Sequence, residues 1–412
     1  MPHETNLIAT LAGGLSIALV CGLLTSKLRL SPLVGYLVAG VLVGPYTPGF
    51  VGDVGLAQQL AEVGVIFLMF GVGLHFSIKN LWAVRSVAVT GAIAQIGVAT
   101  LLGMWLSHSW GWPTSAGLVF GLALSVASTV VMLRTFREDG TLETDNGRIA
   151  VGWLIVEDLA MVLVMVLLPT LSDMPGERAP LLAFLDLPRD ELWASLSITA
   201  VELGLLATFM LLIGRRVFPR LLQLVNDTGS RELFTLAIVV MAIGVAYGSA
   251  VLFNVSFALG AFFAGVVLNG SALNKRVAKK LRPLEDLFAV LFFVAIGMLF
   301  DPAIVLRDPL RVLATVAIIM FGKSIVAAII VLLLHRPMGT ALTVSAGLAQ
   351  IGEFSFILCG MAIANNLLPL EGLNLVIAAA MITIILNPMM FKGMRILEKR
   401  LDTAAARMNP GD

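Results

Sequence analysis

GWLIVEDLAMVLVMVLLP, residues 152–169, places two adjacent carboxylates, Glu157 and Asp158, inside an otherwise apolar run. A run of about 20 apolar residues crosses the bilayer core as a helix. Helix is the expected structure, because an isolated strand would leave its backbone groups unpaired in lipid. Five apolar or small residues precede the pair in this segment and eleven residues follow it, so both acids lie inside the run. Each costs about 2.5–3.5 kcal/mol at that depth on insertion scales, so the pair indicates a function.

The composition of the whole chain is that of a membrane protein. Of its 412 residues 58% are hydrophobic and only 13% are charged, and the mean hydropathy is +0.97. A soluble domain carries about 25% charged residues. The net charge of +1 gives no reason to expect a nucleic-acid partner. Cys21 and Cys359 both lie in apolar stretches, which argues against a disulfide scaffold or a cysteine metal site.

Thirteen segments have the length and apolar character of membrane-spanning helices, some only if short or interrupted. They predict an all-α membrane protein. The segments are 6–26, 31–46, 56–76, 82–106, 114–135, 148–170, 192–217, 231–248, 252–271, 284–301, 309–334, 340–364 and 370–391.

The basic residues support this count of thirteen. If the N-terminus is outside and every segment spans, most of the 27 Lys and Arg fall in inner loops or in a C-terminal group from Lys392 to Arg407. The outer loops then hold only Arg178, Arg189, Arg307 and Arg311. This split obeys the positive-inside rule, which a miscounted helix would disturb. The sequence therefore predicts an N-out, C-in topology.

Two pairs of segments repeat at nearly one offset. IFLMFGVGLHF (66–76) matches VLFFVAIGMLF (290–300) at a shift of 224, and AGVLVG (39–44) matches AGVVLN (264–269) at a shift of 225. The offset equals seven spans, an odd number, so the two halves face opposite ways across the membrane. Such an inverted repeat is typical of secondary transporters. Helices 1–6 and 8–13 form the predicted repeats, and helix 7 links them.

Two predicted helices, 5 and 12, contain polar clusters that indicate interruptions. The clusters lie in LALSVASTVVML (122–133) and GLAQIGEFSFIL (347–358), at equivalent places in the two repeats. Paired broken helices at matching positions are the best sequence indication of a transporter binding site. The polar residues are Ser125, Ser128 and Thr129 in the first segment, and Gln350 and Glu353 in the second.

The acid pair and a buried lysine are the candidate ion-handling groups. Adjacent carboxylates point about 100° apart on a helix, which suggests two different partners. Glu157 and Asp158 cannot both ionise cheaply in apolar surroundings, so one of them can hold a proton near neutral pH and trade it for a cation. Lys323 lies in mid-helix, too deep to reach an interface. Its expected partner is the acid pair, with a helix-terminal carbonyl or another acid as the alternatives.

Other functions fit the residues less well. A symporter for an organic anion would need cationic groups at membrane depth, and only Lys323 is available. A channel would pass cations without proton counterflow. An intramembrane enzyme would need a nucleophile–base pair or a metal cluster, and the sequence offers neither pattern. No cofactor is expected; the expected ligands are the transported ions, K⁺ or Na⁺ and H⁺.

Seven motifs spread over nearly the whole chain carry a resemblance to a known family. They are LSPLVGYLVAGVLVGP (30–45), AEVGVIFLMFGVGLHFS (61–77), SVASTVVML (125–133), IVEDLAMV (155–162), GAFFAGVVLNGS (260–271), LFFVAIGMLFDP (291–302) and AQIGEFSFIL (349–358). The chain resembles the monovalent cation:proton antiporter-2 family, and within it the Kef/YbaL-like potassium/proton antiporters.

The resemblance implies a function and roles for several residues. It implies K⁺/H⁺ efflux by alternating access, with Na⁺/H⁺ exchange as the alternative, and it makes Asp158 the carboxylate that binds cation or proton in turn. Glu157 is expected to pair with Lys323, and the unwound segments correspond to 125–129 and 349–353. Glu157 stands where the glutathione-gated Kef proteins have glutamine, so the number of protons exchanged per cation stays open.

The resemblance also implies an architecture and partners. A sodium/proton-antiporter-like fold is expected over residues 1–397, in a homodimer in the bacterial inner membrane. Helices 1, 2, 8 and 9 would form the dimer part, helices 3–6 and 10–13 a mobile core, and helix 7 the linker. The charged tail 398–412 is expected to begin a linker to a cytoplasmic nucleotide-binding regulatory domain or subunit.

Overall fold

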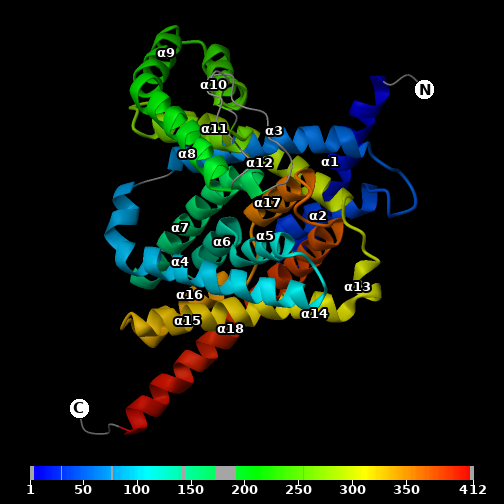
Figure 1. The fold of residues 1–412 in the computed structure, drawn as a ribbon, viewed down its shortest axis with the longest axis vertical. Coiled ribbons are helices and arrows are strands. Elements are labelled where there is room, and N and C mark those ends of the chain that lie inside the picture. The colour runs from blue at the N-terminus through cyan, green and yellow to red at the C-terminus, as the bar shows by residue number, and fades with distance from the viewer. Residues whose placement is uncertain are drawn as a thin grey trace. The chain divides into compact units, whose positions relative to one another are not determined.

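The computed structural model describes residues 4–28, 30–75, 78–138, 140–141, 144–171, 192–253 and 255–408. Over these residues the regular structure is entirely helical (Figure 1). Each of the thirteen segments predicted from hydropathy falls on helix. Arg178 and Arg189, predicted in an outer loop, lie outside the described residues, as do residues 409–412 of the predicted tail.

The helices group into two compact units. The first comprises Met1–Cys21, Tyr36–Ser77 and Val162–Leu299, and the second comprises Gly22–Gly35, Ile78–Met161 and Phe300–Asp412. In the first unit lie most of α1 (Glu4–Lys27) and of α2 (Pro32–Val43), α3 (Val54–His75), η1 (Leu168–Leu171), α8 (Leu192–Phe209), η3 (Met210–Gly214), α9 (Arg215–Asp227), α10 (Arg231–Phe253), α11 (Phe257–Asn269) and α12 (Asn274–Met298).

The second unit holds the segments in which the sequence placed the candidate site. Its helices are α4 (Ile78–Ser109), α5 (Thr114–Ser125), α6 (Thr129–Glu138), most of α7 (Asp145–Leu167), α13 (Ile304–Arg307), α14 (Pro309–Ala317), η4 (Ile318–Gly322), α15 (Lys323–Leu333), α16 (Met338–Leu348), α17 (Glu353–Ala364) and α18 (Leu370–Met408).

Glycines bring helices of the first unit into backbone contact. A Cβ on Gly40 of α2 would overlap the Val294 carbonyl oxygen and lie 2.7 Å from Cα of Gly297 on α12. Gly265 of α11 approaches Cα of Gly73 on α3 in the same way, at 2.9 Å. The shifts of 224 and 225 equate Gly73 with Gly297 and Gly40 with Gly265. Positions matched by the predicted repeat therefore make matching contacts.

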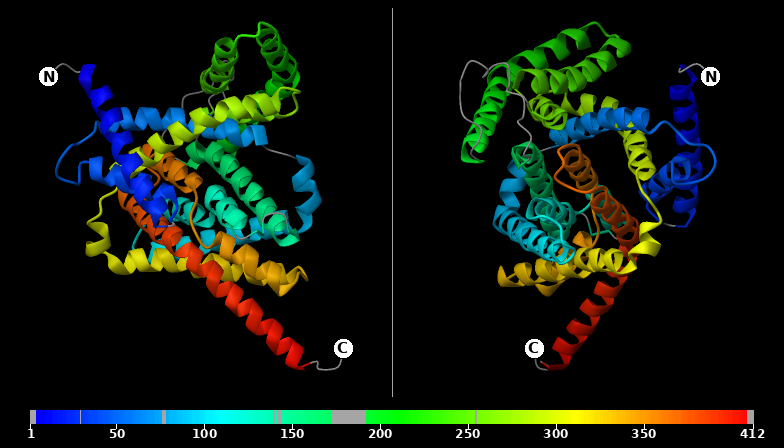
Figure 2. Two further views of the ribbon diagram at one scale, coloured as in Figure 1. Left: turned by 180° about the vertical axis from the view of Figure 1, so that it is seen from behind. Right: turned by 45° about the vertical axis from the view of Figure 1, so that its right-hand side comes forward.

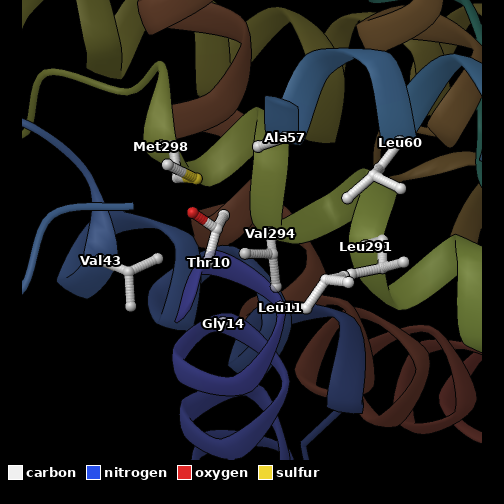
Figure 3. A pocket seen from close by; sticks show the side chains of 9 residues that line it. All are labelled: Thr10, Leu11, Gly14, Val43, Ala57, Leu60, Leu291, Val294 and Met298. Atoms are coloured by element: carbon white, nitrogen blue, oxygen red, sulfur yellow. The ribbon is translucent and has the colours of Figure 1, made fainter. Parts of the chain in front are cut away.

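The first unit also contains a small cavity between α1, α2, α3 and α12 (Figure 3). Its lining is almost wholly apolar, with Leu11, Leu60 and Val294 among the side chains. Thr10 supplies a hydroxyl, which already accepts a hydrogen bond from the Asp53 amide at 3.0 Å. The Thr10 hydroxyl can still donate a hydrogen bond, and the other lining groups are apolar.

In the second unit α5 and α17 pack against each other, and α15 contacts both α4 and α16 (Figures 1 and 2). Trp153 and Phe136 are completely buried in its core. A π-turn, η4, interrupts the eleventh predicted span immediately before Lys323. Such turns often occur at functional sites, because they change the direction in which the next side chain points.

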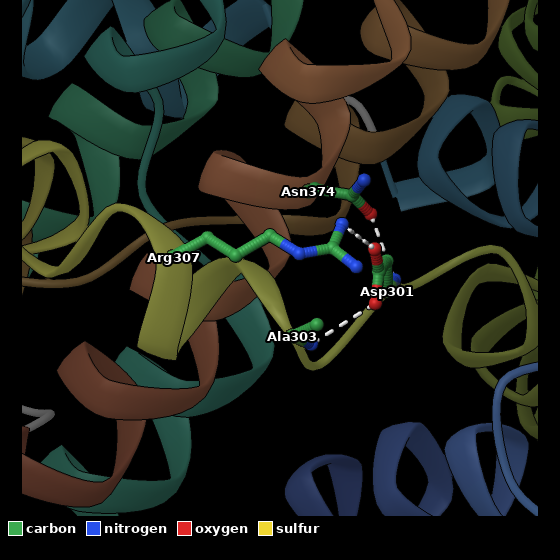
Figure 4. Close-up of polar contacts among 4 residues, drawn as sticks. All are labelled: Asp301, Ala303, Arg307 and Asn374. Atoms are coloured by element: carbon green, nitrogen blue, oxygen red, sulfur yellow. Dashed lines mark hydrogen bonds and ion pairs between the residues drawn. The ribbon is translucent and has the colours of Figure 1, made fainter.

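A polar cluster fixes the turn that leads into α13 (Figure 4). The Asp301 carboxylate accepts hydrogen bonds from the Ala303 amide at 3.0 Å and from Arg307 at 3.2 Å. The Asp301 amide donates to the Asn374 side chain on α18, also at 3.0 Å. One aspartate thereby ties this turn to the start of α18.

The number of membrane crossings stays a prediction. Among the described residues, six helices are individually long and apolar enough to cross a bilayer, or seven if the bent α16–α17 pair is one span. The short helices α2, α5 and α11 are apolar but only 12 or 13 residues long. Short or interrupted helices in the second, fifth and ninth predicted spans account for part of the difference from thirteen.

The expected division into a dimer part and a mobile core stays a prediction, because the compact units group contacting helices and do not show which parts move. The expectation placed the third and tenth spans in the core, whereas α3 and α12 belong to the same compact unit as α10 and α11. The glycine contacts described above hold them there. Which helices form a dimer interface stays a prediction.

Candidate ion-binding site

The two predicted helix interruptions are present in the second unit. The α5 helix ends at Ser125 and the chain is extended at Val126 before α6 begins. The α16 helix ends at Leu348, the chain is extended at Gly352, and α17 follows with a bend of 45°. A broken helix exposes backbone groups that need partners when they are buried. Side chains of the predicted site provide several of these partners.

Gln350 joins the two breaks. Its amide nitrogen donates to the Ser128 carbonyl at 3.0 Å, and its amide oxygen accepts from the Ser128 backbone N–H at 3.1 Å. Gln350 is completely buried, so these bonds replace contacts with water that the backbone cannot make. Beside them Gly352 lies so close to Ala127 that a Cβ there would be 2.6 Å from the Ala127 carbonyl oxygen. The two breaks therefore touch backbone to backbone.

Lys323 is completely buried and is held by carbonyls of both breaks. Its ammonium donates to the Val126 carbonyl at 3.0 Å and to the Gln350 carbonyl at 2.9 Å. Lys323 and Glu157 attract each other electrostatically, but within the described part of the chain the lysine makes no ion pair at 4.0 Å or less. The predicted pairing with Glu157 is therefore an electrostatic attraction without a contact ion pair, and its role stays a prediction. The ammonium binds helix-terminal carbonyls, because the C-terminal ends of half-helices carry partial negative charge.

Glu157 and Asp158 point to different partners, as their angular separation predicts. Glu157 is completely buried, and one of its oxygens accepts a hydrogen bond from the Ala127 amide at 3.0 Å. Asp158 is 8% exposed and accepts from the Thr129 hydroxyl at 3.0 Å. Each carboxylate keeps a second oxygen with no hydrogen-bond partner among the described residues. Unpaired oxygens of this kind are costly when buried and are available to a proton or a cation.

Glu353 brings a third carboxylate to the site. It opens α17, and the Ser128 hydroxyl hydrogen-bonds to it. Its Oε2 also lacks a partner within the described chain. Glu353 and Asp158 lie close enough to repel each other when both are charged. A shared proton or a bound cation would relieve this repulsion.

The Ser128 and Ser125 hydroxyls act mainly on the backbone. Ser128 Oγ accepts from the Val131 amide at 3.3 Å and so caps the start of α6. Ser125 Oγ donates to the Leu122 carbonyl at 2.7 Å within its own helix. All eight residues predicted from the sequence thus lie at or beside the two breaks. Among the described residues, the side chains of Ser125 and Glu157 hydrogen-bond to backbone groups outside this set.

A comparison with known protein families identifies the family of this chain. The family model described as "Sodium/hydrogen exchanger, transmembrane" matches residues 15–395. The chain belongs to this family. It is a membrane transporter of the cation/proton antiporter type rather than an enzyme, and its relatives are transporters as well.

The exchanger is similar in sequence to two curated relatives and in fold to one solved structure. It is 55% identical over 401 residues to an Escherichia coli (strain K12) protein described as a cation/proton antiporter, YbaL, covering 97% of this chain and 70% of that one. It is 32% identical over 379 residues to K(+) efflux antiporter 4 of Arabidopsis thaliana, covering 91% and 62%. The sodium proton antiporter MjNhaP1 from Methanocaldococcus jannaschii has a TM-score of 0.63 at 14% identity, covering 92% and 94%. This last likeness shows the fold alone.

Sequence reasoning missed Gln95 and Asn387, two buried side chains that hold the breaks of the exchanger. Gln95 on α4 donates to the Ser125 carbonyl at 3.0 Å. Ser355 on α17, a member of the polar cluster in 347–358, donates to the Ala123 carbonyl at 2.6 Å. Asn387 on α18 donates to the Ala346 carbonyl at 2.9 Å. Neutral polar residues in apolar helices are common, so only their position opposite a helix break distinguishes these. That position is a property of the tertiary structure.

Proposed function

We propose that the exchanger moves K⁺ outward in exchange for protons, with cation and proton competing for Asp158. This proposal rests on the burial and the hydrogen bonding of the Asp158 carboxylate. It lies almost buried beside a helix break, the Thr129 hydroxyl binds one of its oxygens, and the other oxygen has no partner among the described residues. A proton or a dehydrated cation would satisfy that oxygen.

Competition at one carboxylate couples the two fluxes. An empty, ionised Asp158 is costly to move through an apolar barrier, whereas a protonated or cation-bound Asp158 is neutral. Only the occupied site would then change its exposure from one side of the membrane to the other. This selective crossing gives exchange rather than leak, and it corresponds to alternating access.

The other members of the site supply oxygen ligands and fix the geometry. Glu353, with a free oxygen near Asp158, and the Thr129 hydroxyl are the best placed to share a cation with Asp158. Hard monovalent cations prefer such oxygen ligands. The carbonyls of Val126 and Ser128 are already taken by Lys323 and Gln350, so carboxylate and hydroxyl oxygens are proposed as the main ligands.

The names of relatives favour potassium, and Na⁺/H⁺ exchange is the alternative. Several curated relatives are K(+) efflux antiporters, whereas the likeness to a sodium proton antiporter rests on fold at 14% identity. The relatives at about 30% identity share far more sequence with the exchanger. The cation is therefore proposed from sequence similarity, and the site geometry accommodates either ion.

The expected architecture is part of the proposal. It comprises thirteen crossings with N-out, C-in topology, an inverted repeat, a homodimer and a bacterial inner-membrane location. The two equivalent glycine contacts, Gly40 with Gly297 and Gly265 with Gly73, support the repeat. A cytoplasmic nucleotide-binding regulatory domain or subunit is proposed as a partner of the C-terminal tail.

Proton flux in proteoliposomes tests the function. The purified chain is reconstituted with a pH-sensitive dye inside, and K⁺ or Na⁺ is added outside. We expect K⁺ to drive proton movement, Asp158→Asn to abolish it, and Asp145→Asn to retain it. Asp145 is a matched control, because it lies in the first turn of the same helix with an exposed side chain.

The possible outcomes separate the alternatives. A response to Na⁺ and none to K⁺ would replace the proposed cation. Full exchange by Asp158→Asn would contradict the role of Asp158. Cation flux far faster than a carrier's and without proton movement would indicate a channel.

A further inference from the structure

Gln95 is a completely buried amide on α4 that joins three helices. Its Nε2 donates to the Ser125 carbonyl at the end of α5, at 3.0 Å. Its Oε1 accepts from Trp153 Nε1 on α7, at 3.5 Å. Trp153 precedes Glu157 by four residues and therefore lies on the same face of α7. A chain of polar contacts thus runs from the first helix break to the face of α7 that carries Glu157.

The Trp153 ring packs directly against the backbone of α4, because Gly91 has no side chain there. A Cβ on Gly91, one turn before Gln95, would overlap the six-membered ring of the indole. The ring is completely buried in the core of the second unit. Its N–H therefore has a set direction, and the Gln95 amide is oriented by it.

Gln95 occupies the same relation to the first break as Lys323 does to the second. In each case a side chain on the preceding span donates to the carbonyl at the break: Gln95 to Ser125, and Lys323 to Gln350. A shift of 224 places Lys323 opposite position 99, one helical turn from Gln95. The first break thus receives a neutral donor at Ser125 and the charged donor at Val126, whereas the second receives the charged donor at Gln350.

The bond to Ser125 matters because of the residues that follow it. The next carbonyl, of Val126, binds Lys323, and the next amide, of Ala127, binds Glu157. The Ser125 carbonyl, at the end of α5, is one of the groups that a helix leaves unpaired. Without Gln95 it would be buried without a partner, and the extended segment would shift toward one.

We propose that Gln95, oriented by Trp153, is a positioning residue that fixes the first helix break, so that Val126 and Ala127 face Lys323 and Glu157. Its influence on ion binding rests on the proposed function, whereas its influence on the backbone does not. The two effects are measured separately.

The functional test compares Gln95→Met with Thr100→Val. Methionine keeps the shape of glutamine but cannot donate, and Thr100 lies on the same helix with a buried hydroxyl that has no hydrogen-bond partner among the described residues. In proteoliposomes we expect Gln95→Met to raise the apparent KM for K⁺ about tenfold, the effect of one lost buried hydrogen bond, with a much smaller change in maximal rate. Thr100→Val should leave both values unchanged. A tenfold fall in the maximal rate of Gln95→Met, with an unchanged KM for K⁺, would overturn the positioning role.

The structural test uses amide hydrogen exchange of the detergent-solubilised protein. Peptides covering 122–130 should exchange faster in Gln95→Met, whereas peptides covering 353–364 should not change. Unchanged exchange at 122–130 overturns the proposal even if transport is altered. A wild-type chain that shows no cation/proton exchange would remove the proposed function and leave this test valid.

Two further variants complete the test. Trp153→Phe removes the indole N–H together with the five-membered part of the buried ring, and we expect a smaller rise in KM and in exchange at 122–130, because Gln95 keeps its bond to Ser125. No change in either value would overturn the orienting role of Trp153. If Gln95→Met does not fold, Gln95→Asn, one methylene shorter, must show the same two effects, and wild-type values in it would overturn the proposal.

Discussion

The Lys323 ammonium donates a hydrogen bond to the Gln350 carbonyl at 2.9 Å and a second to the Val126 carbonyl at 3.0 Å. One buried cation thus binds both broken helices, at the negative ends of two half-helices. Its attraction to Glu157 acts without a contact ion pair among the described residues. Lys323 is therefore a clamp between the breaks as well as a counter-charge, and both roles make it important for stability.

Lys323→Met should destabilise the protein strongly. The substitution leaves two buried carbonyls without a donor and the Glu157 charge uncompensated, and breaking such a buried set costs about 3–5 kcal/mol. We expect a clear fall in the thermal unfolding temperature in detergent. Adding Glu157→Gln should restore part of the loss, because it removes the uncompensated charge. A double variant no more stable than Lys323→Met would show that the carbonyl bonds alone account for the effect.

Gln350→Leu should destabilise the crossing of the breaks. Leucine leaves the Ser128 N–H and carbonyl unpaired, at about 1–3 kcal/mol for each buried group. The unfolding temperature should fall, and exchange activity should fall with it. Gln223→Leu serves as the control, because Gln223 is exposed and bonds only within α9, to Asp227. Equal unfolding temperatures for the two variants would contradict the bridging role of Gln350.

Gly352→Ala should reduce transport and stability, because its Cβ would lie 2.6 Å from the Ala127 carbonyl oxygen and 2.8 Å from the carbonyl carbon. Backbone cannot yield as a flexible side chain can, so the two breaks must move apart. Gly360→Ala, in the α17 helix that follows Gly352, meets nothing within 4 Å. It should be neutral, or more stable by up to about 1 kcal/mol through helix propensity. Thermal unfolding and proteoliposome exchange of the pair check this contrast.

Thr129→Val should weaken cation binding, whereas Thr129→Ser should retain it. Valine keeps the shape but removes the hydroxyl that bonds to Asp158 at 3.0 Å, and serine keeps the hydroxyl. A hydrogen bond to a charged group contributes about 1.5–3 kcal/mol. We therefore expect the apparent KM for K⁺ to rise about tenfold or more in Thr129→Val. Wild-type KM in the valine variant would remove Thr129 from the cation site.

The sequence by itself determined the helical segments, the two breaks and the depth of Glu157, Asp158 and Lys323. These features are readable locally, because a charge or a polar cluster in an apolar run is costly enough to be rare. The offset of 224 also identified Gly73 and Gly297 as equivalent before their contacts were known.

Only the tertiary structure decided which groups meet. In it the Lys323 ammonium hydrogen-bonds to two carbonyls and makes no contact ion pair with Glu157 among the described residues, and a π-turn precedes the lysine. The α3 and α12 helices lie in one compact unit with α10 and α11. The tertiary structure also brought Gln95 and Trp153 to the first break. A neutral amide in an apolar helix leaves no periodic signal, and an unpaired carbonyl at a helix end takes whichever donor the packing brings within about 3 Å.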